Sequence, residues 1–207
     1  MHGTTDRPRD GGERPADAAA GQVRACLILS AGRTGTVFLS EVLDRALPAT
    51  RVVHEPFPGR YEHVLANARN AVKVGDGLLR RMFRVSRRLR LNAPAYVEIN
   101  PFLCPATDLL EEMPEPFNLV HIVREPVSWA RSITAFRASR PFRPAIDFVP
   151  FAKPCPVPRP RGWRRMPELQ RALWRWRFCN ERIAEARHLA HRYRVIRYEE
   201  LFSACPR

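Results

Sequence analysis

Two segments of the chain combine the residue types that bind phosphate groups. Residues 30–36 follow an apolar run and contain two glycines, an arginine and three hydroxyl side chains. Glycine lets the backbone approach a ligand closely, hydroxyls donate hydrogen bonds, and arginine adds a fixed positive charge. In the second segment, 118–132, an apolar run is followed by Arg124, Pro126 and Ser132. Pro126 suits the first turn of a helix, so Arg124 would end a strand, Ser132 would lie on the second helical turn, and both would reach one phosphate.

Short strands that alternate with helices are expected to position these two segments. A continuous apolar run over 24–30 is typical of a strand buried on both faces, and apolar residues at helical spacing over 37–47 predict a helix behind the loop. Further strands are predicted at 51–54, 95–99, 118–123 and 194–198. This alternation predicts an α/β fold, a three-layer α/β/α sandwich with a mainly parallel sheet. In such sheets, ligands bind at the carboxyl ends of the strands.

The composition and charge favour a globular domain that binds anions. Hydrophobic residues make up 45% of the 207 residues, and 35 Lys and Arg against 21 Asp and Glu give a net charge of +14. Such a charge favours nucleic acid, anionic lipid, nucleotides or acidic substrates as partners. The five scattered cysteines form no Cys-x-x-Cys pair, which argues against a disulfide framework or a zinc site and favours a reducing, cytoplasmic location. No apolar stretch is long enough for a signal-peptide core or a transmembrane segment.

Four regions outside the two segments have distinct compositions. Residues 1–22 are rich in Gly, Asp, Arg and Pro and predict a disordered tail before one domain over 23–207. A cluster of prolines over 140–167 predicts a long loop that is either disordered or a substrate-facing lid. Residues 78–91 predict an amphipathic helix whose arginines form either a solvated face or a binding face for an acidic acceptor or a membrane. A longer helix is predicted over 169–191.

Both phosphate-binding segments resemble motifs of the sulfotransferases that use 3′-phosphoadenosine-5′-phosphosulfate (PAPS), in particular the bacterial and carbohydrate sulfotransferases. Residues 30–36 are similar to the loop that binds the 5′-phosphosulfate, and they lack the lysine of the Gly-x-x-x-x-Gly-Lys-Ser/Thr loop of ATP- and GTP-hydrolysing proteins. Residues 118–132 are similar to the 3′-phosphate motif of that family. The resemblance implies a P-loop-type α/β/α sandwich with PAPS as co-substrate. The PAPS-binding residues that it implies are Gly32, Arg33, Thr34, Gly35, Thr36, Val37, Arg124 and Ser132.

A third segment, 52–57, resembles the Glu-Pro sequence that follows the second strand in carbohydrate sulfotransferases. The resemblance implies that Glu55 is the catalytic base that removes a proton from the acceptor. His54 is the rival for this role, because histidine has an ordinary pKa of about 6.5 and cytosolic relatives use a histidine. A further interpretation is that Glu55 only caps a loop. Arg33 would stabilise the charge that develops as the 5′-phosphate departs.

Two weaker similarities concern residues 97–101 and 197–201. The first segment resembles a Glu-Lys-Thr-Pro-type segment of the family, but Ile99 and Asn100 replace the Lys and Thr, so a lysine contact is not expected there. The second segment, Arg-Tyr-Glu-Glu-Leu, resembles a late strand end whose Tyr and Glu brace the phosphate loop. Family members usually continue into further helices, whereas this chain has six residues after Leu201, which favours a truncated chain over a compact variant.

The residues and the resemblance together predict a sulfotransferase that transfers a sulfuryl group from PAPS to a hydroxyl or amine of a small-molecule, lipid or carbohydrate acceptor. No metal is expected, because arginines would neutralise the leaving group. The alternatives are an inactive, truncated relative, a basic nucleotide- or nucleic-acid-binding protein, and an ATP-using kinase. The loop spacing disfavours the kinase, and the lack of Gly-aromatic RNA motifs disfavours specific nucleic-acid binding. The identity of the acceptor and the oligomeric state stay open.

Overall fold

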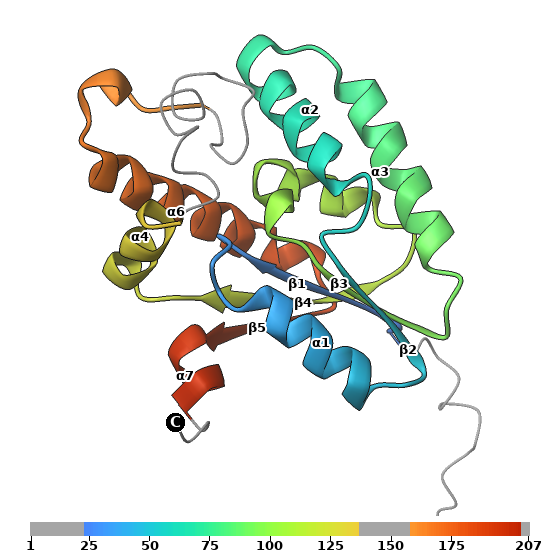
Figure 1. The fold of residues 1–207 in the computed structure, drawn as a ribbon. Coiled ribbons are helices and arrows are strands. Elements are labelled where there is room, and N and C mark those ends of the chain that lie inside the picture. Colours follow the sequence, from blue (N-terminus) through green and yellow to red (C-terminus); the bar gives the residue numbers. More distant parts are fainter. Residues whose placement is uncertain (1–22, 137–157, 204–207) are drawn as a thin grey trace, which may run out of the picture.

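Five parallel strands form the centre of the molecule (Figure 1). The computed structural model describes residues 23–136 and 158–203. Within these residues the strands lie in the order β2-β3-β1-β4-β5, and every neighbouring pair is parallel. Their bounds are β1 (Ala25–Ser30), β2 (Thr50–His54), β3 (Ala95–Ile99), β4 (Phe117–Val123) and β5 (Arg192–Arg197). The predicted parallel sheet is therefore confirmed.

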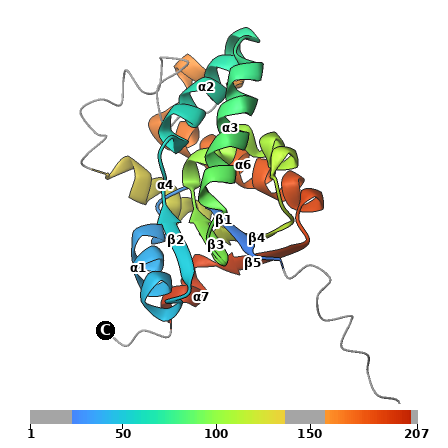
Figure 2. The same ribbon diagram turned by 90° about the vertical axis from the view of Figure 1, so that its right-hand side faces the viewer.

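Helices cover both faces of this sheet. On one face lie α1 (Thr36–Ala46) and the short α7 (Tyr198–Ser203), and on the other lie α2 (Gly59–Val72), α3 (Asp76–Arg90) and α6 (Glu168–Glu185) (Figures 1 and 2). The remaining helical elements are η2 (Pro101–Glu112), α4 (Pro126–Thr134), η4 (Trp163–Arg165) and η5 (Ala186–Leu189). This is the predicted three-layer α/β/α sandwich, with a glycine-containing loop between β1 and α1 as in P-loop-type folds.

Alternate residues of β1 supply the cores of the two faces. Leu27 and Leu29 pack into the larger core, which residues of α2, α3, η2 and α6 complete. Ile28 packs on the other face against Ile99, Ile122 and partly buried residues of α1. Each fully buried Leu or Ile contributes about 1.5–3 kcal/mol of hydrophobic stabilisation, so the central strand is anchored from both sides. The loop that follows β1 therefore starts from a fixed position.

The strand order creates a crevice at the carboxyl end of the sheet. From β1 the chain passes through α1 to β2 on one side of the sheet, whereas β4 and β5 lie on the opposite side of β1. In open α/β sheets, ligands bind where the strand order reverses in this way. The loops that follow β1 and β4 flank this point, and they are the two segments that the sequence indicates as phosphate-binding.

Arginines of α3 reach into the core, which corrects the expectation of a helix with only a solvated or ligand-binding arginine face. Arg87 and Arg90 are 0% and 6% exposed. Arg87 Nη2 lies 2.7 Å from Glu98 Oε1, and Arg90 Nη1 lies 3.1 Å from Glu98 Oε2. Arg87 also pairs with Glu62 of α2. We call these four residues, together with Tyr96, the buried ionic cluster. The periodicity of α3 alone did not reveal it, because its acidic partners belong to α2 and β3.

The buried ionic cluster shifts the pKa values of its members and anchors the segment after β2. Burial alone would raise the pKa of Glu98, but the two neighbouring arginines outweigh burial and hold this pKa below its ordinary value. Burial and the charge of Glu98 raise the pKa of Tyr96, whose phenol donates to Glu98 Oε2 at 2.6 Å. Asn100 also donates to Glu98, at 2.9 Å. Because Arg90 donates to the carbonyl of Phe57, the cluster is connected to the chain just beyond His54 and Glu55.

Some element boundaries differ from the prediction. The long helix is α6, which ends at Glu185; the short turn η5 follows, and β5 begins at Arg192, two residues before the predicted strand. Of the proline-rich segment, residues 140–157 lie outside the described residues, and the rest contains the turn η4. The expected tail, 1–22, also lies outside them. In the part of the chain that the structure describes, no helix combines the length and apolar character needed to cross a membrane.

Candidate functional site

The loop between β1 and α1 has a backbone suited to anion binding. Gly32, Arg33 and Gly35 have φ angles of 82°, 56° and 69°, so three of its residues are in the left-handed region. The first α-helical bond of α1 runs from the Leu39 N–H to the Gly35 carbonyl at 2.9 Å. The N–H groups of the first three residues of α1 therefore have no acceptor inside the helix. Together with the helix dipole, these N–H groups favour an anion at this end of α1.

The hydroxyl side chains of the loop bond to protein groups. Thr34 is buried, and its hydroxyl donates to Ser30 Oγ at 2.8 Å. Ser30 Oγ also accepts from the Gly32 N–H at 3.1 Å. Thr36 Oγ1 lies 3.0 Å from His54 Nε2. Thr34 thus braces the loop from within, while Thr36 connects the start of α1 to the end of β2.

The second segment begins α4 with a strong cap. Glu125 accepts hydrogen bonds from the N–H groups of Val127 and Ser128, at 2.9 and 2.5 Å, and these two bonds hold the pKa of its carboxyl below the ordinary range. Pro126 takes the first helical position, where its missing N–H costs nothing, as the sequence predicted. The N–H of Glu125 donates to Glu199 Oε1 of α7 at 2.9 Å. The residue before the cap, Arg124, is therefore fixed at the end of β4.

Arg124 and Arg33 lie next to each other at the crevice. Arg124 Nη1 donates to the Arg33 carbonyl at 2.9 Å, while its Nε and Nη2 donate to Ser128 Oγ at 3.2 and 2.9 Å. Arg33 Nε lies 3.4 Å from Ser132 Oγ. The guanidinium of Arg124 also stacks on the Tyr198 ring, 4.4 Å from its centroid. The structure thus brings Arg124 and Ser132 to the same place, but the serine that contacts Arg124 is Ser128, which sequence reasoning missed.

Two tryptophans support the backbone beneath these arginines. Trp129 Nε1 donates to the Gly32 carbonyl at 2.6 Å, and Trp176 Nε1 donates to the Arg124 carbonyl at 2.9 Å. Trp129 is fully buried. Trp129 lies on α4 and Trp176 lies on α6, and these two helices pack against each other. The backbone on both sides of the crevice is therefore tied to the same pair of helices.

Three of the arginines at this crevice make no ion pair with a carboxylate in the described part of the chain. They are Arg33, Arg124 and Arg175. Each of these guanidinium groups instead lies near an aromatic ring, 4.3 Å from the Phe136 centroid for Arg33 and 5.4 Å from the Trp129 centroid for Arg175. Unpaired arginines in a concave site attract anions. Sequence reasoning missed Arg175, which comes from α6.

His54 is the last residue of β2, and Glu55 follows it. Both lie at the carboxyl end of the parallel sheet, as do the loops after β1 and β4. The backbone of Glu55 has a φ of 44°, and its N–H donates to the Ile99 carbonyl at 2.9 Å. The Glu55 carboxylate is partly exposed; Oε2 lies 3.9 Å from Arg60 Nη2, and Oε1 lies 4.0 Å from His54 Nε2. In the described structure this carboxylate accepts no backbone hydrogen bond, so it does not cap the loop. His54 is instead engaged with the hydroxyl of Thr36.

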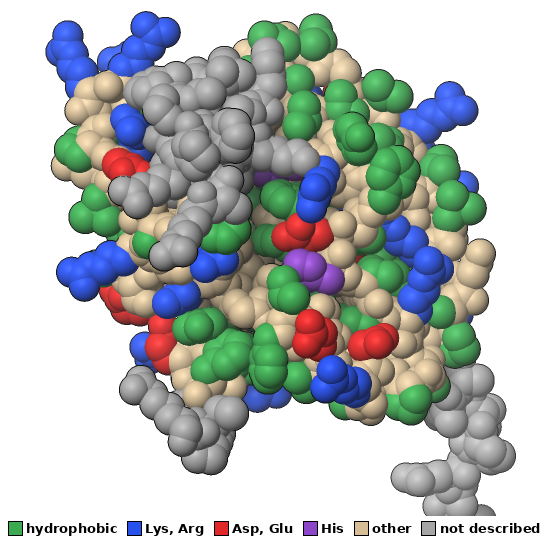
Figure 3. Space-filling view, viewed as in Figure 1, with side chains coloured by type: hydrophobic (Ala, Val, Ile, Leu, Met, Phe, Trp, Pro, Cys, Tyr) green, Lys and Arg blue, Asp and Glu red, His purple; other side chains and the backbone are tan. Residues whose placement is uncertain are grey.

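Residues of the three predicted segments share one pocket of about 970 Å³, a size suited to a nucleotide-like ligand, but His54, Ser128 and Ser132 do not line it. Its wall includes Arg33, Arg124 and Glu55. In the space-filling view, acidic, basic and histidine side chains lie beside each other near the centre of the front face (Figure 3). Further pocket residues are Arg60, His63, Phe102, Cys104, Arg175 and Cys179. Predicted residues from three separate segments therefore meet at one cavity.

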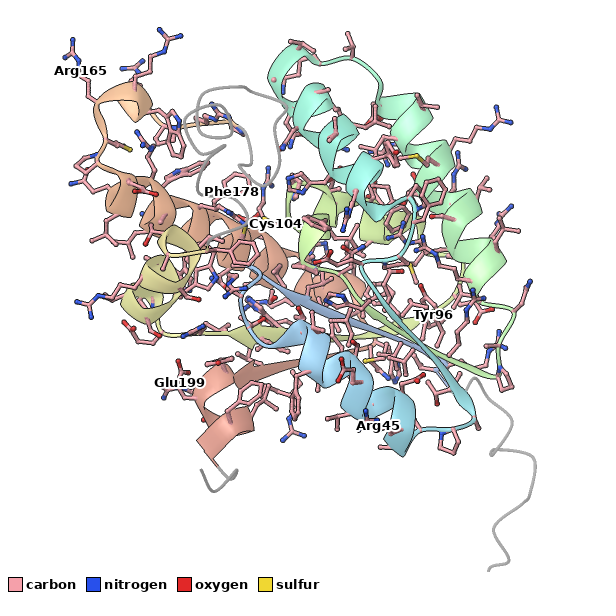
Figure 4. The ribbon with its side chains drawn as sticks, viewed as in Figure 1. Arg45, Tyr96, Cys104, Arg165, Phe178 and Glu199 are labelled. Carbon is pink, nitrogen blue, oxygen red and sulfur yellow. The ribbon has the colours of Figure 1, made fainter. Side chains whose placement is uncertain are left out.

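Two buried cysteines form part of the pocket wall. Cys104 comes from η2 and Cys179 from α6, and their thiols contact each other (Figure 4 labels Cys104). Burial raises the pKa of Cys104. Burial would also raise the pKa of Cys179, but the hydrogen bond from Cys104 and the charge of Arg175 outweigh it and hold this pKa below its ordinary value. Sequence reasoning missed this pair, because its members belong to elements far apart along the chain.

Comparison with protein-family models and with curated proteins gives no match. The solved structures that are similar to this chain include the following two. One is a shikimate kinase from Acinetobacter baumannii in complex with shikimate, with 13% identity, a TM-score of 0.44, and coverage of 88% of this chain and 87% of that chain. The other is a sulfotransferase from Alicyclobacillus acidocaldarius, with 15% identity, a TM-score of 0.47, and coverage of 89% of this chain and 76% of that chain. These likenesses assign no activity to the chain.

Proposed function

We propose that the protein is a transferase that moves a sulfuryl group from PAPS to a hydroxyl or amine of an acceptor. The observation that carries this proposal is the pair Arg33 and Arg124, joined by a direct hydrogen bond and facing one pocket with the N-terminus of α1. Neither guanidinium has a carboxylate partner among the described residues, so the pocket is electrostatically prepared for an anion. Its volume of about 970 Å³ gives room for a nucleotide.

The arrangement supports two phosphate subsites rather than one. The loop amides and Arg33 would bind the 5′-phosphosulfate, as the resemblance of residues 30–36 implies. Arg124, with Ser128 and Ser132 one helical turn apart on α4, would bind the 3′-phosphate. A 3′-phosphate distinguishes PAPS from ATP, and an arginine with two neighbouring hydroxyls offers charge-assisted and neutral hydrogen bonds to such a group. This second subsite favours PAPS over ATP as the donor.

Glu55 is the better candidate for the catalytic base. Its carboxylate faces the pocket and accepts no backbone hydrogen bond in the described structure, whereas His54 is bonded to Thr36. In the transfer, the acceptor atom forms a bond to sulfur while the bond from sulfur to the bridging oxygen breaks, and that oxygen keeps the electron pair. Glu55 would accept the acceptor's proton, and Arg33 would stabilise the charge on the bridging oxygen. The products are the sulfated acceptor and adenosine 3′,5′-bisphosphate.

Calorimetric titration of the purified protein tests the donor site. Adenosine 3′,5′-bisphosphate, adenosine 5′-monophosphate and ATP are compared at moderate salt, because a charge of +14 attracts any polyanion weakly. We expect saturable binding at one site that requires the 3′-phosphate. Arg124→Ala should weaken binding of the bisphosphate by about a hundredfold, the order expected for losing charge-assisted hydrogen bonds.

The matched control is Arg131→Ala, which removes the same charge from an exposed position on α4, the helix that follows Arg124. It should leave the affinity for the bisphosphate unchanged. Equal, salt-sensitive binding of all three nucleotides would overturn the donor assignment, and a clear preference for ATP would favour a kinase. Where the donor site is established, a screen of acceptors with PAPS follows, in which Glu55→Gln should lose turnover while it retains the donor affinity.

A further inference from the structure

The exposed side of α3 carries a line of apolar side chains. The opposite side of the helix is fixed in the core by buried residues such as Leu79 and Phe83. On the solvent side, Leu78, Val85 and Leu89 are 61%, 49% and 65% exposed. Their spacings of seven and four residues place them above one another on one stripe of the helix. In Figure 2 α3 lies at the front of the molecule, and no labelled element covers it.

The connection from α2 to α3 extends this apolar stripe. Val72, at the end of α2, and Val74, in the connection, are both exposed. Between them lies Lys73, which has a φ of 59° and directs the chain from one helix into the next. Solvent-exposed apolar side chains are unremarkable when they are scattered, but a contiguous set marks an interaction surface. Exposed apolar side chains therefore occur along the length of α3 and in the connection before it.

Basic side chains flank the stripe on one side. Arg81, Arg84 and Arg88 are exposed and recur at three- and four-residue spacings beside the apolar residues. Within the described residues, Arg81 and Arg88 form no ion pair, and Arg84 Nε lies 3.4 Å from Glu112. Lys73 adds a further charge at the start of the helix and likewise forms no described ion pair. The surface beside the stripe is therefore positively charged.

The acidic groups near the start of α3 are ion-paired with arginines. Asp76 accepts from Arg80 at 2.8 Å and from Arg69 at 3.2 Å, and these bonds hold its pKa below the ordinary value. Arg80 also pairs with Glu111 and Glu112 of η2, at 2.7 Å each. These pairs lie on the flank of α3 that meets η2. Every one of these carboxylates is ion-paired, but three carboxylates share Arg69 and Arg80, so this flank keeps a negative charge beside the basic flank.

We propose that this surface binds the protein to an anionic phospholipid membrane, with α3 lying in the plane of the interface. We call it the α3 face, and its residues are Val72, Lys73, Val74, Leu78, Arg81, Arg84, Val85, Arg88 and Leu89. A line of apolar side chains beside a row of lysines and arginines is the arrangement of interfacial helices, whose apolar side enters the headgroup region while the cations contact anionic lipids. Charge complementarity selects anionic lipid over neutral lipid.

Nucleic acid fits this surface less well. Single-stranded nucleic acid is bound by grooves that combine cations with aromatic rings for base stacking, and the α3 face contains no aromatic residue. A duplex would contact the arginines but would leave the leucines and valines without an apolar partner. A membrane engages both sets of side chains at the same time, because its headgroups meet the cations and its acyl chains cover the apolar stripe.

Vesicle co-sedimentation of the full chain tests this proposal. One set of vesicles contains phosphatidylcholine alone, and the other contains phosphatidylcholine mixed with phosphatidylglycerol. We expect binding to the anionic vesicles only. Leu78→Ser combined with Leu89→Ser should weaken that binding roughly tenfold. Arg81→Gln combined with Arg88→Gln should weaken it by about thirtyfold, at about fivefold for each arginine removed near the surface.

A matched control separates this surface from the overall charge of the protein. Arg192→Gln combined with Arg194→Gln removes two exposed arginines from the edge strand β5. In the sheet, β1 and β4 separate β5 from β3, the strand that follows α3. We expect this variant to bind anionic vesicles as the unmodified chain does. Thermal unfolding verifies that each variant is folded, which is expected because all the changed side chains are exposed.

Three results would overturn the proposal. The first is equal binding of the unmodified chain and the double-serine variant, because the apolar stripe would then play no part. The second is a loss in the β5 variant as large as that in the α3 arginine variant, because attraction would then follow net charge alone. The third is binding of a polyuridine strand without binding to anionic vesicles, which would assign the surface to nucleic acid.

Discussion

Arg124 Nη1 donates a hydrogen bond to the backbone carbonyl of Arg33 at 2.9 Å, so the end of β4 is bonded directly to the loop after β1. The same guanidinium is bonded through Nε and Nη2 to Ser128 of α4. One side chain therefore fixes the distance between the two segments that we propose to bind the 5′- and 3′-phosphates. Disturbing Arg124 should therefore affect both segments.

Ser128→Ala should weaken binding of adenosine 3′,5′-bisphosphate by about tenfold. Ser128 Oγ accepts two bonds from Arg124 and keeps its guanidinium in place, and a hydrogen bond to a charged group contributes about 1.5–3 kcal/mol. Ser132→Ala removes a single, longer bond from Arg33, and we expect a loss of less than about threefold. Calorimetry measures both. A larger loss for Ser132→Ala would identify Ser132 as the main hydroxyl of the 3′-phosphate subsite, as the sequence predicted.

Gly35→Ala should destabilise the protein and abolish binding of the bisphosphate. A Cβ at Gly35 would lie 2.4 Å from Cζ of Phe202, and its φ of 69° is unfavourable for any residue with a Cβ. Strain in the left-handed region costs about 1–2 kcal/mol, and displacement of the Phe202 ring adds to it. We expect the melting temperature to fall by roughly 5–10 °C, measured by differential scanning calorimetry.

Gly75→Ala is the matched control for this prediction. Gly75 has a φ of 82°, but a Cβ there would meet nothing within 4 Å. This variant should therefore show only the backbone strain, about 1–2 kcal/mol, and it should bind the bisphosphate normally. If Gly75→Ala lowered the melting temperature as much as Gly35→Ala, the contact with Phe202 would not contribute, and the close approach of α7 to the loop would be unimportant.

His54→Ala and Glu55→Gln should affect different properties. His54 bonds to the Thr36 hydroxyl at the first residue of α1, so its removal should loosen the phosphate loop and weaken the bisphosphate affinity by about fivefold. Glu55 makes no hydrogen bond to the loop, so Glu55→Gln should leave that affinity unchanged. Titration of both variants measures the difference without knowledge of the acceptor. Strongly reduced affinity in Glu55→Gln would show that this carboxylate supports the donor site rather than the acceptor.

Arg87→Met should lower the free energy of unfolding by about 3–5 kcal/mol at neutral pH, because it leaves Glu62 buried without its cation and leaves Glu98 with Arg90 alone. The folded-state pKa of Glu98 lies below its ordinary value of 4.5. The stability due to its ion pairs is therefore complete above about pH 4.5 and is lost as the pH falls through the lower folded-state pKa. The deficit of the variant should thus shrink on acidification, as measured by urea unfolding.

Arg88→Met on the same helix is the control for the buried ionic cluster. Arg88 is exposed and makes no ion pair among the described residues, so its replacement should change the free energy of unfolding by less than about 0.5 kcal/mol. A cost at Arg88 as large as at Arg87, or a deficit of Arg87→Met that is independent of pH, would mean that the buried pairs contribute no net stability in this protein.

The fold was predictable because its signals are local. The apolar run of β1, the glycines at 32 and 35 and the helical spacing of α1 lie within one short stretch, and their order alone specifies strand, loop and helix. Pro126 marked the start of α4 through its fixed φ and missing N–H. The alternation of such units then favours a parallel sheet with covered faces, which the structure confirms.

The rest of the candidate site depends on contacts between distant elements. Ser128 was overlooked because the motif directed attention to Ser132, one turn later, and only the packing of Arg124 selects between them. Arg175 and Cys179 come from α6, whose sequence reads as an ordinary amphipathic helix until it is packed against η2 and α4. The arginines of α3 divide between core and surface because Glu98 lies beneath them, which no local pattern records.

The position of the phosphate loop has a consequence for its motions. On one side the loop is joined to β1, whose amides are bonded to strands on both sides and should be the slowest in the protein to exchange with solvent hydrogen. On the other side it rests against Phe202 of α7, a helix of six residues beyond an edge strand. We therefore expect the amides of β1 to exchange slowly and those of α7 to exchange rapidly. A ligand that orders the loop would slow amide exchange chiefly in α7.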